Sequence, residues 1–150
     1  MHPSIHKDIG AYVETAFCGA VAATAGGTGD DTAVTGATLD RQDYDSAVLS
    51  IAYSATLGAT ETLALSDIEI QESDDGSAWA TAESIADDVA AQATGGAGGS
   101  TEVGTKQVKV ALRGRKRYVR FNFTPDLSAD DTDTAIVAAE AVLAGKRVTP

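Results

Sequence analysis

Residues 107–123, QVKVALRGRKRYVRFNF, contain two segments in which apolar and polar residues alternate. Alternation with a period of two is typical of a β-strand that covers a core with one face and meets water with the other. The apolar positions are Val108, Val110, Leu112, Val119, Phe121 and Phe123. The outward positions include Lys109, Arg113, Tyr118, Arg120 and Asn122. The stretch predicts two strands, apolar on one side and largely basic on the other, joined at residues 114–116 by a tight antiparallel connection.

The same period recurs earlier in the chain, in SAVLSIAYSATL (46–57) and TLALSDIEIQES (62–73). In the second segment the apolar positions change parity at residues 66–67, which predicts a β-bulge. The sequence DDGS (74–77) predicts a tight hairpin turn, because Asp-Gly supports the positive φ angles of such turns. We expect Trp79 to pack back over this hairpin.

Two segments are compatible with more than one structure. Residues 81–93 fit a short helix or irregular edge structure, and residues 132–148 fit a helix or a long strand. Many short strands, small residues and glycine-rich breaks predict an all-β fold. We expect an antiparallel β-sandwich, jelly-roll-like, with an extended or helical N-terminal arm. The predicted division is an arm with a Gly-rich linker over residues 1–37 and a sandwich domain over residues 38–150.

The N-terminal arm has two interpretations. Residues 1–17 fit an amphipathic helix, or an extended arm that becomes ordered only against a partner. In either case its apolar residues are expected to contact that partner. These residues are Ile5, Ile9, Tyr12, Val13 and Phe17.

Charge is unevenly distributed in a chain of 150 residues with a formal net charge of −11. Residues 1–105 carry two basic and seventeen acidic residues, whereas residues 106–150 carry nine basic and five acidic ones. An acidic surface repels phosphate backbones, so we expect no nucleic-acid partner. The single cysteine, Cys18, excludes an intramolecular disulfide. The chain has no apolar run of transmembrane length and no secretory signal pattern, so we expect no membrane partner and assembly in the host cytoplasm.

Side chains suited to catalysis or metal binding are scarce. The two histidines, His2 and His6, both lie in the predicted arm, so no base is available for a serine or cysteine nucleophile in the folded part. A structural zinc site needs four ligands, which the arm does not supply. The acidic segments at 72–75 and 126–133 could hold calcium, but neither matches the twelve-residue calcium loop, and turn formation with solvation is the favoured interpretation. We therefore expect a non-enzymatic protein with no cofactor and no metal site.

The basic stretch has three interpretations: a nucleic-acid surface, a solvated strand face that balances nearby acidic loops, or a docking edge for a carboxylate-rich partner. Because the phenylalanines alternate inward, Tyr118 is the only residue there that could stack on a base. The docking interpretation assigns five residues to a partner interface: Arg113, Arg115, Lys116, Arg117 and Arg120.

Three segments, read together, resemble a family of structural proteins from tailed-phage head gene clusters. They are TLDRQDYDSAVLSIAYSA (38–55), IEIQESDDGSAWATA (68–82) and LRGRKRYVRFNFTPDLS (112–128), followed by a last strand ending near LAGKRVTP (143–150). The resemblance covers about residues 38–150. It implies a β-sandwich virion protein, a decoration or auxiliary protein of the head.

The resemblance also implies partners and a location. The expected partners are the major capsid protein of the same phage and further copies of this chain on the lattice, and the expected location is the capsid surface of the virion. Residues 73–79 and 117–120 are also similar to a motif of discoidin-type carbohydrate-binding modules. One alternative is therefore a glycan-binding module displayed on the virion through loops that include Trp79. A head-completion or tail component is the other.

Overall fold

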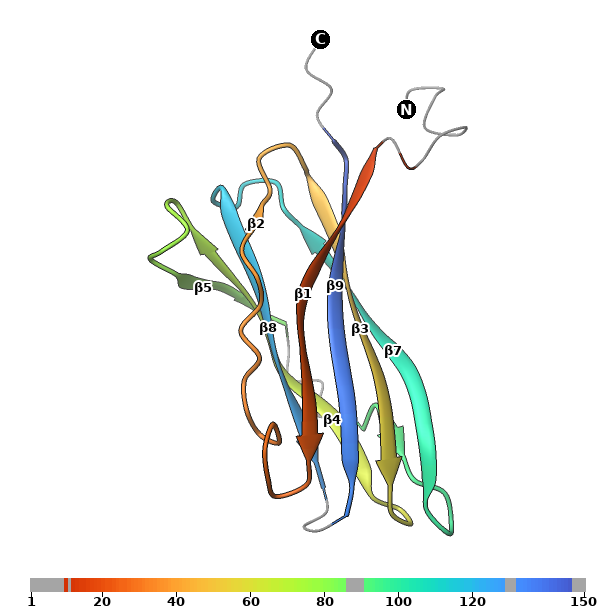
Figure 1. The fold of residues 1–150 in the computed structure, drawn as a ribbon. Coiled ribbons are helices and arrows are strands. Elements are labelled where there is room, and N and C mark those ends of the chain that lie inside the picture. The colour runs from red at the N-terminus through yellow and green to blue at the C-terminus, as the bar shows by residue number, and fades with distance from the viewer. Residues whose placement is uncertain (1–9, 11, 86–90, 129–131, 147–150) are drawn as a thin grey trace.

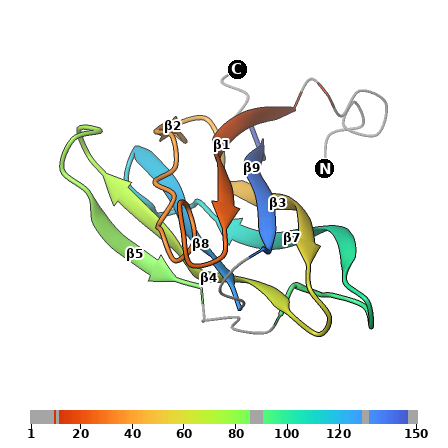
Figure 2. The same ribbon diagram turned by 60° about the horizontal axis from the view of Figure 1, so that its bottom comes forward.

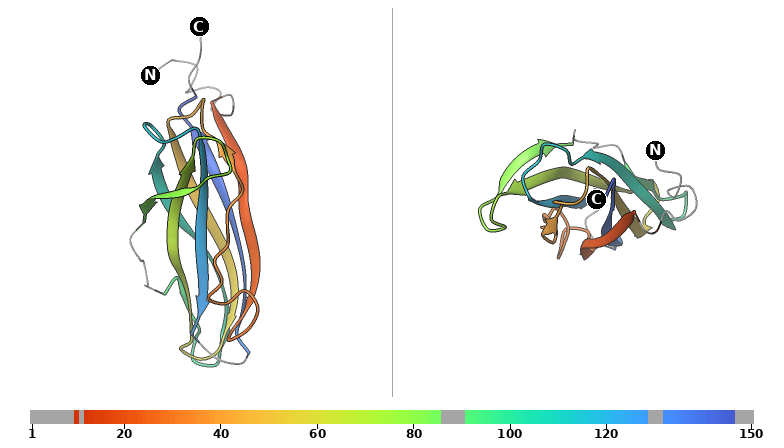
Figure 3. Two further views of the ribbon diagram at one scale, coloured as in Figure 1. Left: turned by 90° about the vertical axis from the view of Figure 1, so that its left-hand side faces the viewer. Right: turned by 90° about the horizontal axis from the view of Figure 1, so that it is seen from above.

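The fold is a sandwich of two antiparallel β-sheets, seen in a computed structural model that describes residues 10, 12–85, 91–128 and 132–146 (Figure 1). Sheet one has the order β1 (Val13–Thr24), β9 (Thr134–Ala144), β3 (Ser46–Leu57), β7 (Ser100–Ala111). Sheet two has the order β2 (Leu39–Asp40), β8 (Tyr118–Leu127), β4 (Thr62–Ser73), β5 (Ala80–Ser84), and β6 (Ala93–Thr94) also pairs with β4. Figure 2 shows the two layers obliquely, and Figure 3 shows them from the side and from above. The predicted all-β sandwich is confirmed.

The strand order is that of a jelly roll. Strands pair from the two ends of the sequence inward: β1 with β9, β2 with β8, and β3 with β7. In the middle of the chain, β4 pairs with β5 and β6. This is a long hairpin wrapped into two sheets, which is how jelly-roll domains cover most of their strand edges.

The core lies between the sheets and is built from the inward positions of the alternating strands. Its largest fully buried side chains include Phe121, Phe123, Leu49, Ile51, Leu63, Leu65 and Leu112. The period-two predictions for β3, β4, β7 and β8 are therefore confirmed for these positions. The predicted bulge in β4 is confirmed as well, because the pairing with β8 shifts register between Ser66 and Glu69. Asp67 lies within that shift and adopts a positive φ of 47°.

The sequence predicted a tight antiparallel connection at residues 114–116, and this prediction is wrong. β7 pairs with β3 in sheet one, whereas β8 pairs with β4 and β2 in sheet two. The segment therefore crosses from one sheet to the other. The structure also corrects the prediction for Asn122. Its side chain lies on the outer face of sheet two, as predicted, but it is buried there instead of exposed to solvent.

The predicted division at residue 37 is corrected by β1, which belongs to the sandwich and pairs along its whole length with β9. Residues 34–37 then connect the edges of the two sheets. The Ala37 amide donates to the Cys18 carbonyl of β1, and Val34 forms a β-bridge with Phe123 of β8. A helix is excluded for residues 13–17, which are strand. Two segments were compatible with a helix or another structure, residues 81–93 and 132–148. In the described residues neither is a helix: Ala80–Ser84 form the edge strand β5, and Thr134–Ala144 form the strand β9.

Candidate interaction surfaces

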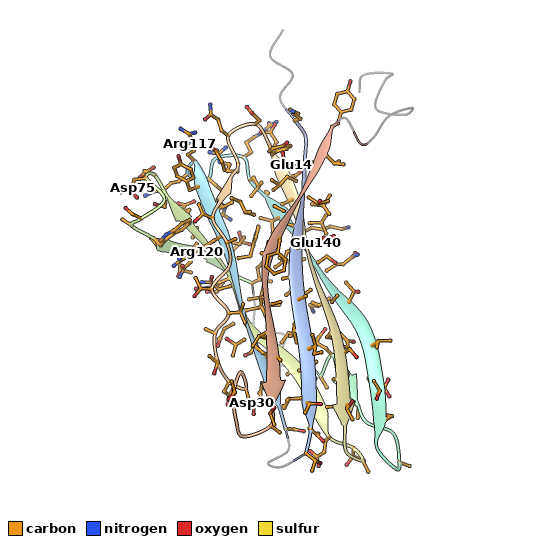
Figure 4. All side chains as sticks on the ribbon, in the orientation of Figure 1. Glu14, Asp30, Asp75, Arg117, Arg120 and Glu140 are labelled. Atoms are coloured by element: carbon orange, nitrogen blue, oxygen red, sulfur yellow. The ribbon has the colours of Figure 1, made fainter. Side chains whose placement is uncertain are left out.

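The basic crossover and the start of β1 lie at the same end of the sandwich. Within the described residues we call this the cationic end and define it as residues 12–14, 40–46, 112–118 and 144–146. Figure 4 shows Glu14, Asp75 and Arg117 toward this end and Asp30 at the opposite one. The pairing explains the grouping, because Val13 lies opposite Ala144, and Ala144 lies opposite Ser46 in β3.

Four of the five predicted interface cations form ion pairs with carboxylates of the same chain. The pairs are Arg113–Asp45 at 3.2 Å, Lys116–Asp74 at 2.8 Å, Arg117–Asp40 at 2.8 Å, and Arg115–Glu83. The hydrogen bond from Arg117 holds the pKa of Asp40 below its usual range. This end of the molecule therefore balances its own charge, as the solvated-face interpretation expected, while most of these groups stay accessible.

The turn at residues 40–45 holds the cationic end together. Arg41 donates from its Nε to the Lys116 carbonyl at 2.8 Å, and the Asp45 carbonyl accepts from the Leu112 amide at 2.9 Å. Tyr44 donates its hydroxyl to Glu14 of β1, and this bond raises the pKa of the buried Tyr44 to about 12. The turn thus connects the crossover between the sheets to the first strand.

The fifth predicted cation, Arg120, lies on the outer face of sheet two. Its guanidinium lies over the Trp79 ring, 4.4 Å from the centroid, and its Nε donates to Gln71 at 2.7 Å. This cation–π contact places Trp79 against β8, as expected for a residue that packs back over the hairpin. One face of the indole is therefore covered by Arg120, and a sugar could stack only on the other.

Glu69 connects the rest of the outer face of sheet two. Its carboxylate accepts from Asn122 at 2.8 Å, from Gln71 at 2.7 Å and from Thr81 at 3.0 Å. Asn122 also accepts from the Gly36 amide at 3.1 Å. Polar groups on this face are thus matched to one another within the chain.

The outer face of sheet one has a different composition. The register places six outward positions on each of its four strands, and among these twenty-four only Lys109 and Glu140 carry charge. Alanine, serine, threonine and valine occupy most of the others. Three large apolar side chains are exposed on it: Phe17 by 64%, Ile136 by 65% and Val103 by 74%. We call these twenty-four positions the uncharged face.

The predicted interface residues of the N-terminal arm fall into separate places. Val13 is half-buried where the cationic end meets the uncharged face, and Phe17 lies further along β1 on the uncharged face. Tyr12 directly precedes β1 and is half-buried. Ile5 and Ile9 lie outside the described residues.

Sequence reasoning identified Phe17 but missed the uncharged face around it. In β3 and β9 the inward and outward positions alternate as expected for strands. The small outward residues, such as Ser50, Ala52 and Ala138, could therefore be taken for the solvated side of an ordinary strand. The absence of lysine and glutamate at those positions was the available signal, because solvated faces of antiparallel sheets usually carry charge.

The end opposite the cationic end is acidic. Among described residues it carries Asp30, Asp31, Glu61, Asp126 and Asp133, with no lysine or arginine near them in its loops. Burial, followed by the charges of Asp31 and Asp30, raises the pKa of Asp126.

These acidic side chains are used mainly by the local loops. Asp30 accepts from the Gly26 and Leu127 amides, both at 2.8 Å, and Asp133 accepts from the Gly58 amide at 2.8 Å. Across the part of the chain that the structure describes, no group of three or more His, Cys, Asp or Glu side chains is placed to hold a metal ion. No helix in that part is long and apolar enough to cross a membrane.

Comparison with known proteins does not identify a family for this chain. No protein-family model matches the chain, and no curated protein matches it in sequence. Among solved structures it is similar to the crystal structure of the PBSX exported protein XepA, with 18% identical residues and a TM-score of 0.39. That similarity covers 91% of this chain and 39% of the XepA chain, so the chain spans well under half the length of that protein. This TM-score lies below 0.5, so the likeness establishes neither a shared fold nor a shared function.

Proposed function

We propose that the chain is a structural protein of a tailed-phage head, which binds the capsid lattice as a decoration protein and stabilises the shell. The proposal starts from the sequence resemblance over residues 38–150. The observation that carries it is the cationic end, where the start of β1 and the basic crossover, two segments predicted to meet a partner, lie together.

The ion pairs at the cationic end can be exchanged at small cost. The Arg113 side chain is 80% exposed, and the pair between Lys116 and Asp74 is also open to water. Exposed pairs of this kind contribute about 0–1 kcal/mol to stability. Their cations can therefore turn to carboxylates of a shell protein without unfolding the sandwich.

Charge asymmetry along the sandwich would orient the molecule on the shell. One end carries cations among its carboxylates and the other carries carboxylates alone. Complementary charge steers association and selects one orientation more than it adds affinity. The cationic end would therefore face the shell and the acidic end the solvent.

The test measures how many copies of the chain bind to shells that lack it. Replacing Arg113, Lys116 and Arg117 with glutamine should weaken binding at least about tenfold, which corresponds to 1.4 kcal/mol. Copies per particle are counted by native mass measurement or quantitative gel densitometry, at two salt concentrations.

A matched control places its change at the acidic end, where Asp31→Asn removes one charge and keeps a residue type that tolerates the positive φ found there. A second variant lacks residues 1–11 and leaves β1 intact. Occupancy that is unchanged in both the triple variant and the truncated chain would contradict attachment through this end.

A further inference from the structure

The uncharged face lacks the polar network that covers the other sheet. Its cross-strand rows place small or apolar side chains beside one another, as in Ala20–Ala138–Ala52 and Ala22–Ile136–Ser54. Exposed apolar patches of several hundred Å² on a folded protein mark interaction sites. A sheet face of this composition is a surface that another sheet can cover.

The face carries both a projection and a hollow. Phe17 projects from β1 and borders a shallow hollow, which small side chains (Ser50, Ala52, Ala138 and Ala139) and the carboxylate-bearing Glu140 also line. A surface with a knob next to a hollow can be complementary to itself when a two-fold axis relates two copies, because each knob enters the hollow of the other.

We propose that the uncharged face packs against the same face of a second copy of this chain, so that the protein is a two-fold symmetric dimer. The four-strand sheets of the two copies would lie face to face, with Phe17 of each copy in the hollow of the other. This inference goes beyond the proposed function, since it concerns a different surface and a different partner.

The size of the face fits a stable dimer. Its strands are up to 12 residues long, which is about 40 Å, and four strands are about 19 Å wide. The face therefore offers roughly 750 Å², close to the ~800 Å² that each partner buries in a stable interface.

Charge allows a second copy to approach through this face more easily than through the others. Two copies with a net charge of −11 each repel one another through most of their surface. The uncharged face carries one cation, Lys109, and one anion, Glu140, so it adds no net charge to the contact. It is therefore the face through which two copies can approach with the least repulsion.

The experiment determines the mass of the full chain in solution by light scattering and sedimentation equilibrium, from submicromolar to 200 µM. We expect twice the chain mass of 15.3 kDa at about 10 µM and above. Ala52→Glu introduces a charge at the centre of the face and should weaken the dimer at least about 100-fold. Phe17→Ser removes the knob from an exposed position, so its effect does not depend on whether Ala52→Glu folds.

The matched control is Ala97→Glu, which adds the same charge at an exposed loop position near the acidic end and should leave the dimer intact. A wild-type monomer at all concentrations would overturn the proposal, and so would a dimer that both face variants preserve. If the wild type is a monomer and the face variants lose binding to shells, the face belongs to the shell protein instead. Shell binding by the cationic-end variants is measured separately, so failure of the dimer leaves the proposed function open to its own test.

Discussion

The two outer faces of this sandwich cover the same core but differ in composition: one carries a hydrogen-bonded network of polar side chains, and the other carries mainly small, uncharged ones. On sheet two, Glu69, Gln71 and Asn122 satisfy one another and also bind the chain segment at Gly36. On sheet one, the outward side chains are small, and three large apolar ones are left exposed. The polar groups of the first face are satisfied within one chain, whereas the second leaves Phe17, Ile136 and Val103 exposed to solvent. Stability is therefore expected to depend more on the face of sheet two, and the proposed association on the face of sheet one.

The strongest expected contrast compares one substitution on each face. Asn122→Ala removes a buried amide and leaves the Gly36 amide and Glu69 short of partners, so the free energy of unfolding should fall by about 2–3 kcal/mol. Ser50→Ala on sheet one should change it by less than about 0.5 kcal/mol. Urea unfolding followed by tryptophan fluorescence and circular dichroism measures both. Equal losses for the two variants would remove the contrast between the faces.

The hairpin turn of sheet two gives an intermediate, pH-dependent effect. Asp75 accepts from the Ala78 and Ser77 amides and from the Ser73 hydroxyl, and these bonds hold its pKa well below its usual range. A lowered folded pKa stabilises the protein above the unfolded pKa of about 4, and this contribution is lost as the pH falls through the folded value. The difference in unfolding free energy between wild type and Asp75→Ala should therefore be constant from pH 7 to about 4.5 and shrink below that.

The control for this pH series is Thr105→Ala on the uncharged face, which changes no carboxylate. Its difference from the wild type should stay flat over the whole range. A difference for Asp75→Ala that grows as the pH falls would contradict the assigned bonds.

The smallest expected effect separates the two sides of β1. Phe17 points outward, while its neighbour Cys18 is buried, and burial raises the pKa of the Cys18 thiol to about 11. In the folded protein at pH 8, the thiol should react with a disulfide reagent at least about 100-fold more slowly than in urea, because little thiolate forms. Absorbance of the released thiolate follows the reaction. Rapid reaction of the folded protein would show that β1 separates from β9.

Much of the fold could be predicted because one side of each long strand is buried. The alternation in residues 46–57 and 117–123 identifies the core residues, and the parity change at residues 66–67 identifies the bulge. The crossing at residues 114–116 could not be predicted, since a short glycine-containing connection has the same local sequence whether it joins paired strands or opposite sheets.

The candidate surfaces were predictable only in part. The cations of residues 113–117 are obvious in the sequence, but their carboxylate partners come from distant segments, such as Asp40 and Glu83. β1 was hidden because its pairing with β9 shifts register between Phe17 and Gly19, which breaks the period-two pattern. The uncharged face needs the register of four strands before its rows can be seen at all.

The position of β9 has a consequence for how the chain is made. β9 follows every other strand described, yet it lies inside sheet one between β1 and β3, and Val13 must pair with Ala144. At bacterial or eukaryotic synthesis rates the ribosome needs roughly 10 s to travel from one to the other. During that time β1 has no neighbour within its sheet, and such distant pairings form slowly. The edge of β1 is therefore expected to stay unpaired until the last described strand has been made.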